Sequence, residues 1–265
     1  MTSANALLSQ LAAAEADAQD RRVIVLVGVT GDGKSSTGNT LANAPAFAVS
    51  SGLSSATQEN SHADFMDGDV ATRVVDTIGF CDTSLTHEAC LERFRSFGDH
   101  TPCGIDCFLF VVRWGRFKPE HDAALNTFFR NVGDEAFSHT VICFTHCTLD
   151  AAALKVALDA DAPPSLRSLL NRVGGVTGVD NGAESSTSGQ RLLHEIVAFI
   201  STDSRYSNAA LEEAQAKHAV AEEEERAAFA AAVSDWRKGT GPVVVEREVS
   251  STFRAAPTES AAVAV

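Results

Sequence analysis

The sequence predicts an α/β fold in which a mostly parallel central sheet carries helices on both faces. Three observations support this prediction. Between about residues 22 and 202, short apolar runs alternate with amphipathic stretches, which is the pattern of repeated βα units. The runs at 22–28 and 107–112 are apolar almost throughout, as expected of strands covered on both faces. The 265 residues are 45% hydrophobic and 21% charged, a balance that allows a full hydrophobic core.

The order of the elements follows from the same alternation. The expected strands are 22–28, 72–76, 107–112, 139–145 and 175–179, with a weaker edge strand between 58 and 70. The expected helices are 34–43, 87–97, 119–131, 150–171 and 187–201. The predicted domains are an N-terminal helical extension at 1–21, the α/β domain at 22–203, a C-terminal helix at 204–238 and a flexible tail at 239–265.

The C-terminal helical extension has one apolar stripe. Phe229, Val233 and Trp236 recur at helical spacing in an Ala- and Glu-rich stretch, and the acidic run at 222–225 is expected to be its solvated face. The sequence leaves two possibilities open. The stripe either folds back over the α/β domain or is presented to a partner, as in a coiled coil.

Charge and targeting signals limit the partners of the chain. A formal net charge of -14 argues against general binding to nucleic acid or to anionic lipid, since both require a basic face. The first 20 residues lack the basic and apolar regions of a secretory signal, and no apolar run approaches the roughly 20 residues that span a bilayer. We therefore expect a soluble, cytoplasmic protein without a membrane span of its own, whose recruitment to a membrane would require a partner.

The six cysteines are expected to remain reduced thiols in the cytosol, and several lie in apolar runs where Cys behaves as a small core residue. The alternative is a zinc site with ligands from two C-x₃-C pairs and a histidine, namely Cys103/Cys107, Cys143/Cys147 and His100 or His146. That spacing differs from the C-x₂-C spacing of structural zinc sites, so free thiols are the preferred interpretation.

The clearest functional signal is a phosphate-binding loop. The run GVTGDGKS at 28–35 matches G-x-x-x-x-G-K-[ST] and lies between an apolar strand and a helix, the context that the motif requires. Glycines allow backbone N–H groups to wrap closely around a β-phosphate, and the N-terminus of the following helix favours negative charge. This context disfavours the alternative of a plain glycine-rich turn. The loop does not by itself decide between ATP and GTP, or between a kinase and a hydrolase.

Each polar residue of the loop has an expected role. Lys34 is expected to bridge the β- and γ-phosphates, Ser35 to bind Mg²⁺ and Ser36 to position the α-phosphate. The predicted nucleotide-binding residues of the loop are Thr30, Gly31, Asp32, Gly33, Lys34, Ser35 and Ser36.

A second motif, D-x-x-G, follows the next apolar strand about 40 residues later. Asp76 is expected to hold Mg²⁺ through water, and the N–H of Gly79 to meet the γ-phosphate. Between the two motifs, Thr57 is the best candidate to close over the γ-phosphate and Mg²⁺. The predicted metal-site residues are therefore Ser35, Thr57 and Asp76, and the alternatives to Thr57 are Ser54, Ser55 and Thr37.

Three stretches resemble the GIMAP/AIG-type GTPases, an immunity-associated, septin-like family related to the chloroplast Toc receptor GTPases. The run GVTGDGKSSTGNTL (28–41) resembles the extended phosphate loop of this family. DTIGF (76–80) is similar to its switch motif, with Ile78 where Pro is usual. CGIDCFLFVVRWGRFKPEHDAAL (103–125) resembles its hydrophobic box. The resemblance covers about residues 22–202 and implies a P-loop GTPase fold, with an AIG-type G domain at 22–203.

The resemblance also implies how a guanine base would be recognised. The run FTHCTLD after the fourth main strand corresponds to the family's fourth motif, so Thr145 and His146 are the expected base contacts, unless they merely begin the next helix. Thr148 stands where a carboxylate is usual, which leaves Asp150, or no acid at all, for the guanine N1–H and N2–H₂. Asn181 is the candidate from the fifth motif, and an Asx turn in Asp-Asn-Gly is its alternative interpretation.

Members of this family bind GDP and GTP with Mg²⁺ and pair through the nucleotide face. The resemblance therefore implies a slow GTPase that acts as a switch for dimerisation or assembly. Phe80 stands where Ras-type GTPases place the Gln that orients the attacking water, which predicts slow unaided hydrolysis. Arg116 from a partner chain is expected to neutralise charge at the γ-phosphate, with Arg113 as the second choice, and a surface ion pair is the alternative role for both. The predicted catalytic residues are Arg116, Thr57 and Lys34.

Two other functional classes remain open. A nucleotide-locked scaffold that assembles without hydrolysing GTP is favoured by the missing Gln and the degenerate fourth motif. An ATP-using P-loop enzyme, such as a kinase, is favoured only by the missing guanine-reading acid. The intact Lys34, Ser35 and Asp76 favour the GTPase.

Overall fold

The computed structural model describes residues 21–49, 60–78, 87–98, 100, 101, 103–115, 117–182, 185–200, 204–213, 215, 216 and 220. Their centre is a six-stranded sheet in the order β2-β3-β1-β4-β5-β6. The strands are β1 (Arg22–Gly28), β2 (Ser61–Asp67), β3 (Val70–Asp76), β4 (Cys107–Arg113), β5 (Thr140–Thr145) and β6 (Gly175–Val179). Strand β2 is antiparallel to β3, and every other neighbouring pair is parallel. The predicted mostly parallel sheet with an edge strand between 58 and 70 is confirmed.

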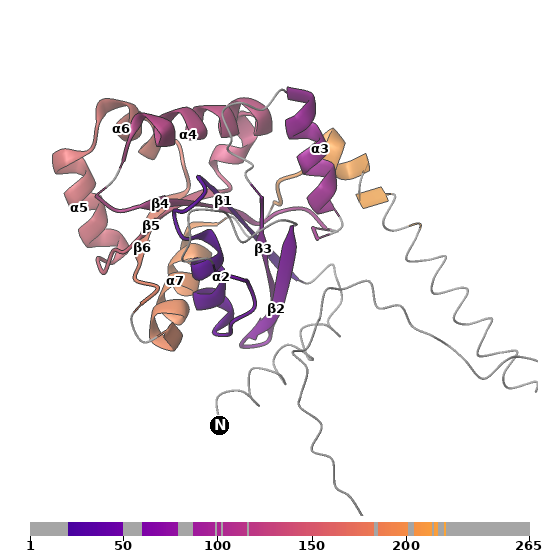
Figure 1. Cartoon of the computed structure of the whole chain (residues 1–265), viewed down its shortest axis with the longest axis horizontal. Coiled ribbons are helices and arrows are strands. Elements are labelled where there is room, and N and C mark those ends of the chain that lie inside the picture. Colours follow the sequence, from indigo (N-terminus) through magenta and orange to yellow (C-terminus); the bar gives the residue numbers. More distant parts are fainter. Residues whose placement is uncertain are drawn as a thin grey trace, which may run out of the picture. The chain divides into compact units, whose positions relative to one another are not determined.

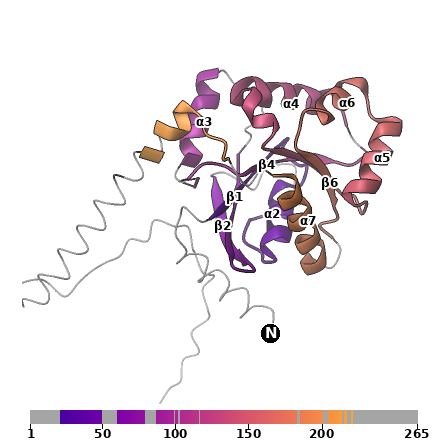
Figure 2. The same cartoon turned by 180° about the vertical axis from the view of Figure 1, so that it is seen from behind.

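Helices cover both faces of the sheet (Figures 1 and 2). They are α2 (Lys34–Ala42), α3 (His87–Gly98), α4 (Pro119–Val132), the 3₁₀ helix η2 (Asp134–Phe137), α5 (Ala151–Asp161), α6 (Pro164–Leu170) and α7 (Ser185–Phe199). Helices α2 and α7 lie on one face, and α3, α4, α5 and α6 lie on the other. The sheet is therefore the middle layer of three, as expected for strands that are apolar on both faces.

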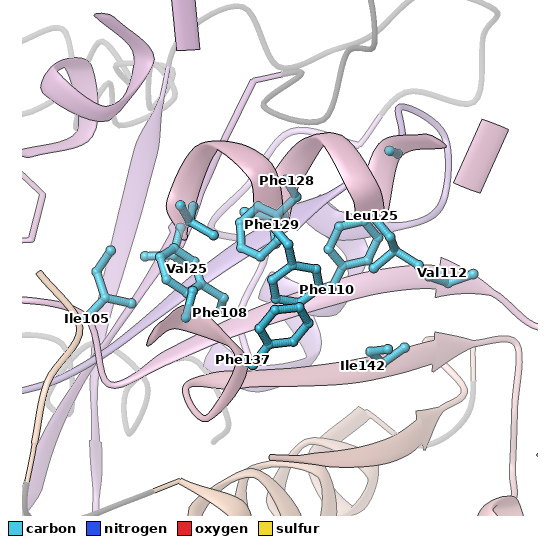
Figure 3. Packing of buried hydrophobic residues seen from close by; sticks show 14 of the residues in the cluster. Val25, Ile105, Phe108, Phe110, Val112, Leu125, Phe128, Phe129, Phe137 and Ile142 are labelled. Atoms are coloured by element: carbon cyan, nitrogen blue, oxygen red, sulfur yellow. The ribbon is translucent and has the colours of Figure 1, made fainter. Parts of the chain in front are cut away.

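Strand β4 shows how one sequence serves both faces. Phe108 and Phe110 belong to the core cluster under α4, whereas Leu109 and Val111 belong to the cluster that α2 and α7 cover. This alternation follows from the two-residue period of a strand. Figure 3 shows the α4 side, where the rings of Phe108 and Phe110 meet the ring of Phe128 edge to face, with centroids 5.2 and 5.7 Å apart.

The expected helix at 150–171 is two helices in the structure. Helix α5 ends at Asp161, and Ala162 is extended, with φ −68° and ψ 140°. The reason is the Pro163–Pro164 pair, because proline lacks an N–H group and disfavours helical backbone in the residue before it. Pro164 then begins α6, a position where proline is compatible with a helix.

The chain after α7 packs onto the α/β domain. Ile105 and Tyr206 form an isolated antiparallel bridge, and the Tyr206 hydroxyl donates to the carbonyl of Val132 at 2.7 Å. Leu211 is fully buried in the core cluster that contains Phe108. Residues 1–20 and 221–265 lie outside the described residues, so the N-terminal extension, the stripe of Phe229, Val233 and Trp236, and the tail stay predictions.

The parallel strands β1, β3, β4, β5 and β6 end at one common edge of the sheet. Loops that follow these carboxyl ends form the usual binding crevice of an open α/β sheet. All of the described residues that the sequence assigns to nucleotide binding lie at or just beyond this edge.

Candidate functional site

Residues 29–33 form the connection from β1 to α2 at this edge. Gly31 and Gly33 have φ of 90° and 99°, a region that residues with side chains rarely adopt. Space is also limited at Gly33, where an added Cβ would lie 3.3 Å from Cγ2 of Thr145. The N–H of Thr37 donates to the carbonyl of Gly33 at 2.8 Å, so the loop leads directly into the first turn of α2.

Lys34 is buried, and its ammonium group lies over the loop rather than in solvent. Its Nζ donates to the carbonyls of Gly28 and Val29, both at 3.1 Å. These bonds hold a positive charge beside the loop before any anion is bound. The position suits an ammonium group that must reach phosphate oxygens.

Ser35 and Asp76 are in direct contact. The Ser35 hydroxyl donates to Oδ2 of Asp76 at 2.6 Å, and Asp76 is 1% exposed. Hydroxyl and carboxylate oxygens are the ligands that Mg²⁺ prefers, so this pair fits a magnesium site. Thr57, the third predicted metal-site residue, lies outside the described residues.

The first part of the D-x-x-G motif is held by side chains that were not among the predicted site residues. Asn60 accepts from the N–H of Ile78 at 3.1 Å, and Arg93 of α3 donates to the carbonyl of Ile78 at 2.9 Å. The hydroxyl of Thr77 donates to the carbonyl of Leu26 at 2.7 Å. These bonds tie the motif to β1 and α3. Gly79 lies outside the described residues.

Asp32 has a buried partner on α4. Its Oδ2 lies 2.9 Å from Nε2 of His121, and both residues are buried. Burial raises the pKa of the Asp32 carboxyl above its usual range, and the nearby His121, Lys34 and Arg113 offset part of that rise. Asp32 was predicted to bind nucleotide and His121 was not, because a pair that joins loop and helix across 89 positions leaves no local pattern.

Thr145 and His146 face different surroundings. The buried Thr145 hydroxyl donates to the backbone carbonyl of Asp32 at 2.8 Å. His146 is exposed and has φ of 54°. Of the two residues predicted to contact a base, the structure therefore bonds Thr145 to the phosphate loop and leaves the His146 ring accessible.

Asp150 is the N-cap of α5. Its Oδ1 accepts from the N–H of Ala153 at 2.8 Å, a bond that satisfies one of the free donors at the start of a helix. Thr148 is exposed. The carboxylate at the end of the run FTHCTLD is thus already engaged in local structure.

Asn181 joins the end of β6 to α2. Its Nδ2 donates to the Thr37 hydroxyl at 3.1 Å, and its Oδ1 accepts from the Thr40 hydroxyl at 2.9 Å. The Asx turn considered as an alternative does occur, but Asp180 forms it by accepting from the N–H of Gly182 at 3.1 Å. Asn181 is therefore near the loop, with its amide oxygen and one amide hydrogen in use.

Arg191 of α7 fixes the neighbouring loop after β5. It donates to the carbonyl of Gly178 at 2.9 Å and to the carbonyl of Leu149 at 3.5 Å. Gly178 also lets the Leu149 carbonyl approach β6 closely, since an added Cβ would lie 2.7 Å from that oxygen. Arg191 was missed because an arginine on an amphipathic helix usually indicates only a solvated face.

A cavity with a volume of about 350 Å³ adjoins Ser36 and Asn181, and its volume is within the size range of small-ligand pockets. It is lined by Ser36, Asn39, Thr40, Asn43, Ala44, Pro45, Val49 and Asn181. The lining includes two predicted nucleotide-binding residues, Ser36 and Asn181. The cavity therefore extends the site from the phosphate loop along α2.

Other predicted features concern groups elsewhere in the chain. Arg116 lies outside the described residues, whereas Arg113 ends β4 and is half-buried. In the described part of the chain, no group of three or more His, Cys, Asp or Glu side chains could hold a metal ion. Cys103, Cys107, Cys143 and Cys147 are free thiols. Among the helices described, none is both long and apolar enough to cross a bilayer.

Comparison with known sequences gives two curated relatives from Arabidopsis thaliana. Immune-associated nucleotide-binding protein 10 is 32% identical over 125 residues, which are 46% of this chain and 27% of that protein. Immune-associated nucleotide-binding protein 5 is 30% identical over 158 residues, which are 58% of this chain and 51% of that protein. The chain thus spans about a quarter to a half of the length of these relatives.

Comparison with solved structures gives Toc33 from Arabidopsis thaliana. A dimerisation-deficient mutant of Toc33 matches with a TM-score of 0.53 and 19% identity, covering 71% of this chain and 86% of that one. Toc33 in complex with Mg²⁺ and GMPPNP matches with a TM-score of 0.53 and 16% identity, covering 75% and 93%. At this level of identity the likeness establishes the fold, which is the predicted P-loop GTPase fold.

The profile of the AIG1 family matches residues 22–227, which is well over half of the sequence. The match includes the phosphate loop, the D-x-x-G motif and the hydrophobic box that carried the resemblance in the sequence. The chain therefore belongs to the AIG1 family.

Proposed function

We propose that this chain binds GTP and GDP with Mg²⁺, hydrolyses GTP slowly, and uses the bound nucleotide as a switch for dimerisation or assembly. The observation that carries the proposal is the contact between Ser35 and Asp76 beside the buried Lys34. In one place it combines a hydroxyl and a carboxylate for Mg²⁺ with an ammonium group for phosphate. Family membership and the Toc33 complex with Mg²⁺ and GMPPNP support this assignment.

Each residue has a separate role in the proposal. Lys34 leaves the carbonyls of Gly28 and Val29 and bonds to the β- and γ-phosphate oxygens. Ser35, Asp76 and Thr57 hold the metal, which supplies neutralisation of the charge on the phosphate oxygens when it is bound. The backbone N–H groups of residues 30–36 and of Gly79 hold the phosphates.

Hydrolysis is proposed to be slow in one chain alone, because Phe80 offers no group that orients water. A partner chain would then supply the positive charge, with Arg116 as the first candidate. Arg113 is the weaker candidate, since its charge already acts on Asp32 in the phosphate loop of the same chain. A structure of the chloroplast translocon components atToc33 and psToc159, for whose GTPase activity dimerisation is important, matches with a TM-score of 0.53. That finding motivates the partner-stimulated form of the proposal.

A nucleotide-locked scaffold is the second proposal. It is favoured by Phe80 and by Asp150, whose carboxylate caps α5. In either form the protein is proposed to be cytoplasmic, with any membrane association arising through a partner. An ATP-using enzyme is a third and weaker possibility.

The test measures binding of fluorescent GTP, GDP and ATP in Mg²⁺, together with phosphate release over a range of protein concentrations. Lys34→Ala should abolish binding, and Lys155→Ala, a change at an exposed lysine of α5, is the matched control. Guanine-selective binding with turnover per chain that rises with concentration supports the switch. Guanine binding without turnover supports the scaffold, and a preference for ATP contradicts both.

A further inference from the structure

Asp32 occupies an unusual place in the phosphate loop. It stands between Gly31 and Gly33, whose φ angles are 90° and 99°. Glycine can adopt such angles because it has no side chain. Glycine has the largest conformational freedom of any residue, so the loop is most free to change shape on either side of Asp32. Contacts that fix Asp32 therefore restrict the loop at its most flexible place.

Three groups of Asp32 are held. Its N–H donates to the carbonyl of Val29 at 3.4 Å, which is a long bond within the loop itself. Its carbonyl accepts from the Thr145 hydroxyl at 2.8 Å. Its carboxylate lies 2.9 Å from Nε2 of His121. The last contact is the one that links the loop to α4.

The proton on His121 can be assigned from its second contact. The N–H of Lys118 donates to Nδ1 of His121 at 2.9 Å, so Nδ1 is an acceptor and Nε2 carries the ring hydrogen. This Nε2 is the atom that lies 2.9 Å from Oδ2 of Asp32. The ring also stacks on Phe117, with centroids 5.8 Å apart. The hydrogen bond at Nδ1 and the stacking on Phe117 thereby hold the buried His121 ring with Nε2 toward Asp32.

We propose that His121 is a positioning residue for the phosphate loop: it holds Asp32, and through Asp32 the loop, in the shape that receives a phosphate. The inference rests on the proposed nucleotide binding for its functional consequence, but its structural part concerns the free protein. A preformed loop avoids part of the ordering cost of binding, so removal of His121 lowers affinity although His121 touches no nucleotide. The same ring joins the loop to the start of α4, through the Lys118 N–H and Phe117.

The test compares four proteins: wild type, His121→Leu, His121→Gln and His139→Leu. His121→Leu removes the donor to Asp32, whereas the amide nitrogen of His121→Gln can still donate from nearly the same place. His139 is the matched control, because it is a buried histidine whose Nδ1 lies 3.4 Å from the Asp106 carbonyl, before β5 and away from the loop. Two readouts are needed: the Kd for GDP with Mg²⁺, and amide hydrogen exchange of residues 29–34 in the nucleotide-free protein.

For His121→Leu we expect a Kd about tenfold higher and faster exchange in the loop, the scale expected for loss of a buried polar contact to a charged group. His121→Gln should recover most of both effects. His139→Leu should lower the melting temperature but leave the Kd within about twofold, because it removes packing rather than a contact to the loop.

Two results would overturn the inference. One is loop exchange in His121→Leu that equals the wild type. The other is a loss of affinity no larger than that of His139→Leu at an equal loss of stability. If the wild type binds no nucleotide, the proposed function fails, and the exchange measurement alone decides on His121. If His121→Leu does not fold, His121→Phe, which keeps a ring beside Phe117 but offers no donor to Asp32, gives the same comparison.

Discussion

The hydroxyl of Thr145 at the end of β5 donates a 2.8 Å hydrogen bond to the backbone carbonyl of Asp32, 113 positions earlier in the chain. Thr145 is fully buried, and its methyl carbon also faces Gly33. The strand end that the family resemblance assigned to base recognition thus supports the phosphate loop directly.

Replacement of Thr145 by Val should therefore weaken all nucleotides alike. Val keeps the shape of Thr but lacks the donor, so the Asp32 carbonyl loses its partner in a buried place. We expect GDP affinity to fall about tenfold, while the ratio of GDP to IDP affinity stays unchanged. Thr145→Ser, which keeps the hydroxyl, is the control. Calorimetric titration of each variant with GDP and IDP gives both numbers, and a changed ratio would mean that Thr145 contacts the base.

The contact between Ser35 and Asp76 leads to a prediction about Mg²⁺. In the wild type, removal of Mg²⁺ with EDTA should weaken GTP binding strongly, because the metal shares the phosphate charge with Lys34. In Ser35→Ala, binding should be weak from the start, and EDTA should change it by less than about threefold. Ser36→Ala is the comparison, since it alters the neighbouring hydroxyl and should keep the metal dependence. Equal EDTA effects in all three proteins would exclude Ser35 as a metal ligand.

Two carboxylates are available near the expected base position among the described residues that follow β5 and β6. Asp150 is engaged as the N-cap of α5, whereas Asp180 accepts only from the nearby Gly182 N–H and adjoins Asn181. We expect Asp180→Asn to reduce the preference for GDP over XDP by about tenfold, because an amide offers a donor where the carboxylate offers an acceptor. Asp150→Asn should leave this preference unchanged, since its amide oxygen can still cap α5. Competition binding measures both, and the opposite result would assign base recognition to the loop after β5.

The fold could be predicted from the sequence because its signals are local. The strands at 22–28 and 175–179 coincide with β1 and β6. The apolar run of the first and the β-branched residues of the second are local signals that need no tertiary information. The helix expected at 150–171 was wrong as a single element. Its amphipathic pattern continues through Pro163 and Pro164, and the proline pair outweighs the pattern.

Motif spacing points to candidate residues that would touch a phosphate or a metal, but not to residues that position one another. Lys34, Ser35 and Asp76 stand in motifs whose spacing reflects contact with a phosphate or a metal. His121 and Arg191 act through long-range contacts, His121 with Asp32 and Arg191 with the carbonyls of Gly178 and Leu149. Such contacts impose no spacing on the sequence. For the same reason the bonds of Asn181 to Thr37 and Thr40 were not foreseen.

The edge strand β2 carries a pH-dependent contact. Nδ1 of His62 lies 2.8 Å from Nδ1 of His100, so only one of the two nitrogens can carry a hydrogen there. Burial lowers the pKa of His62 to about 4, with further lowering by the charge of Arg73. Asp64 opposes this effect, but its carboxylate is bound to Arg73 at 2.7 Å. His62 therefore stays neutral in the folded protein at pH values where the unfolded chain is protonated.

Stability should consequently fall on acidification between pH 6.5 and pH 4, because the unfolded chain binds a proton there that the folded protein does not. Above pH 6.5 both states are neutral at His62, and its contribution is constant. From pH 7 to pH 5 the loss due to His62 should be about 2 kcal/mol. Urea unfolding at both pH values measures it, and His62→Asn, which cannot be protonated, should show a loss smaller by about that amount. Replacement of the exposed His194 by Asn is the matched control, and equal losses in His62→Asn and the wild type would show that acid acts elsewhere.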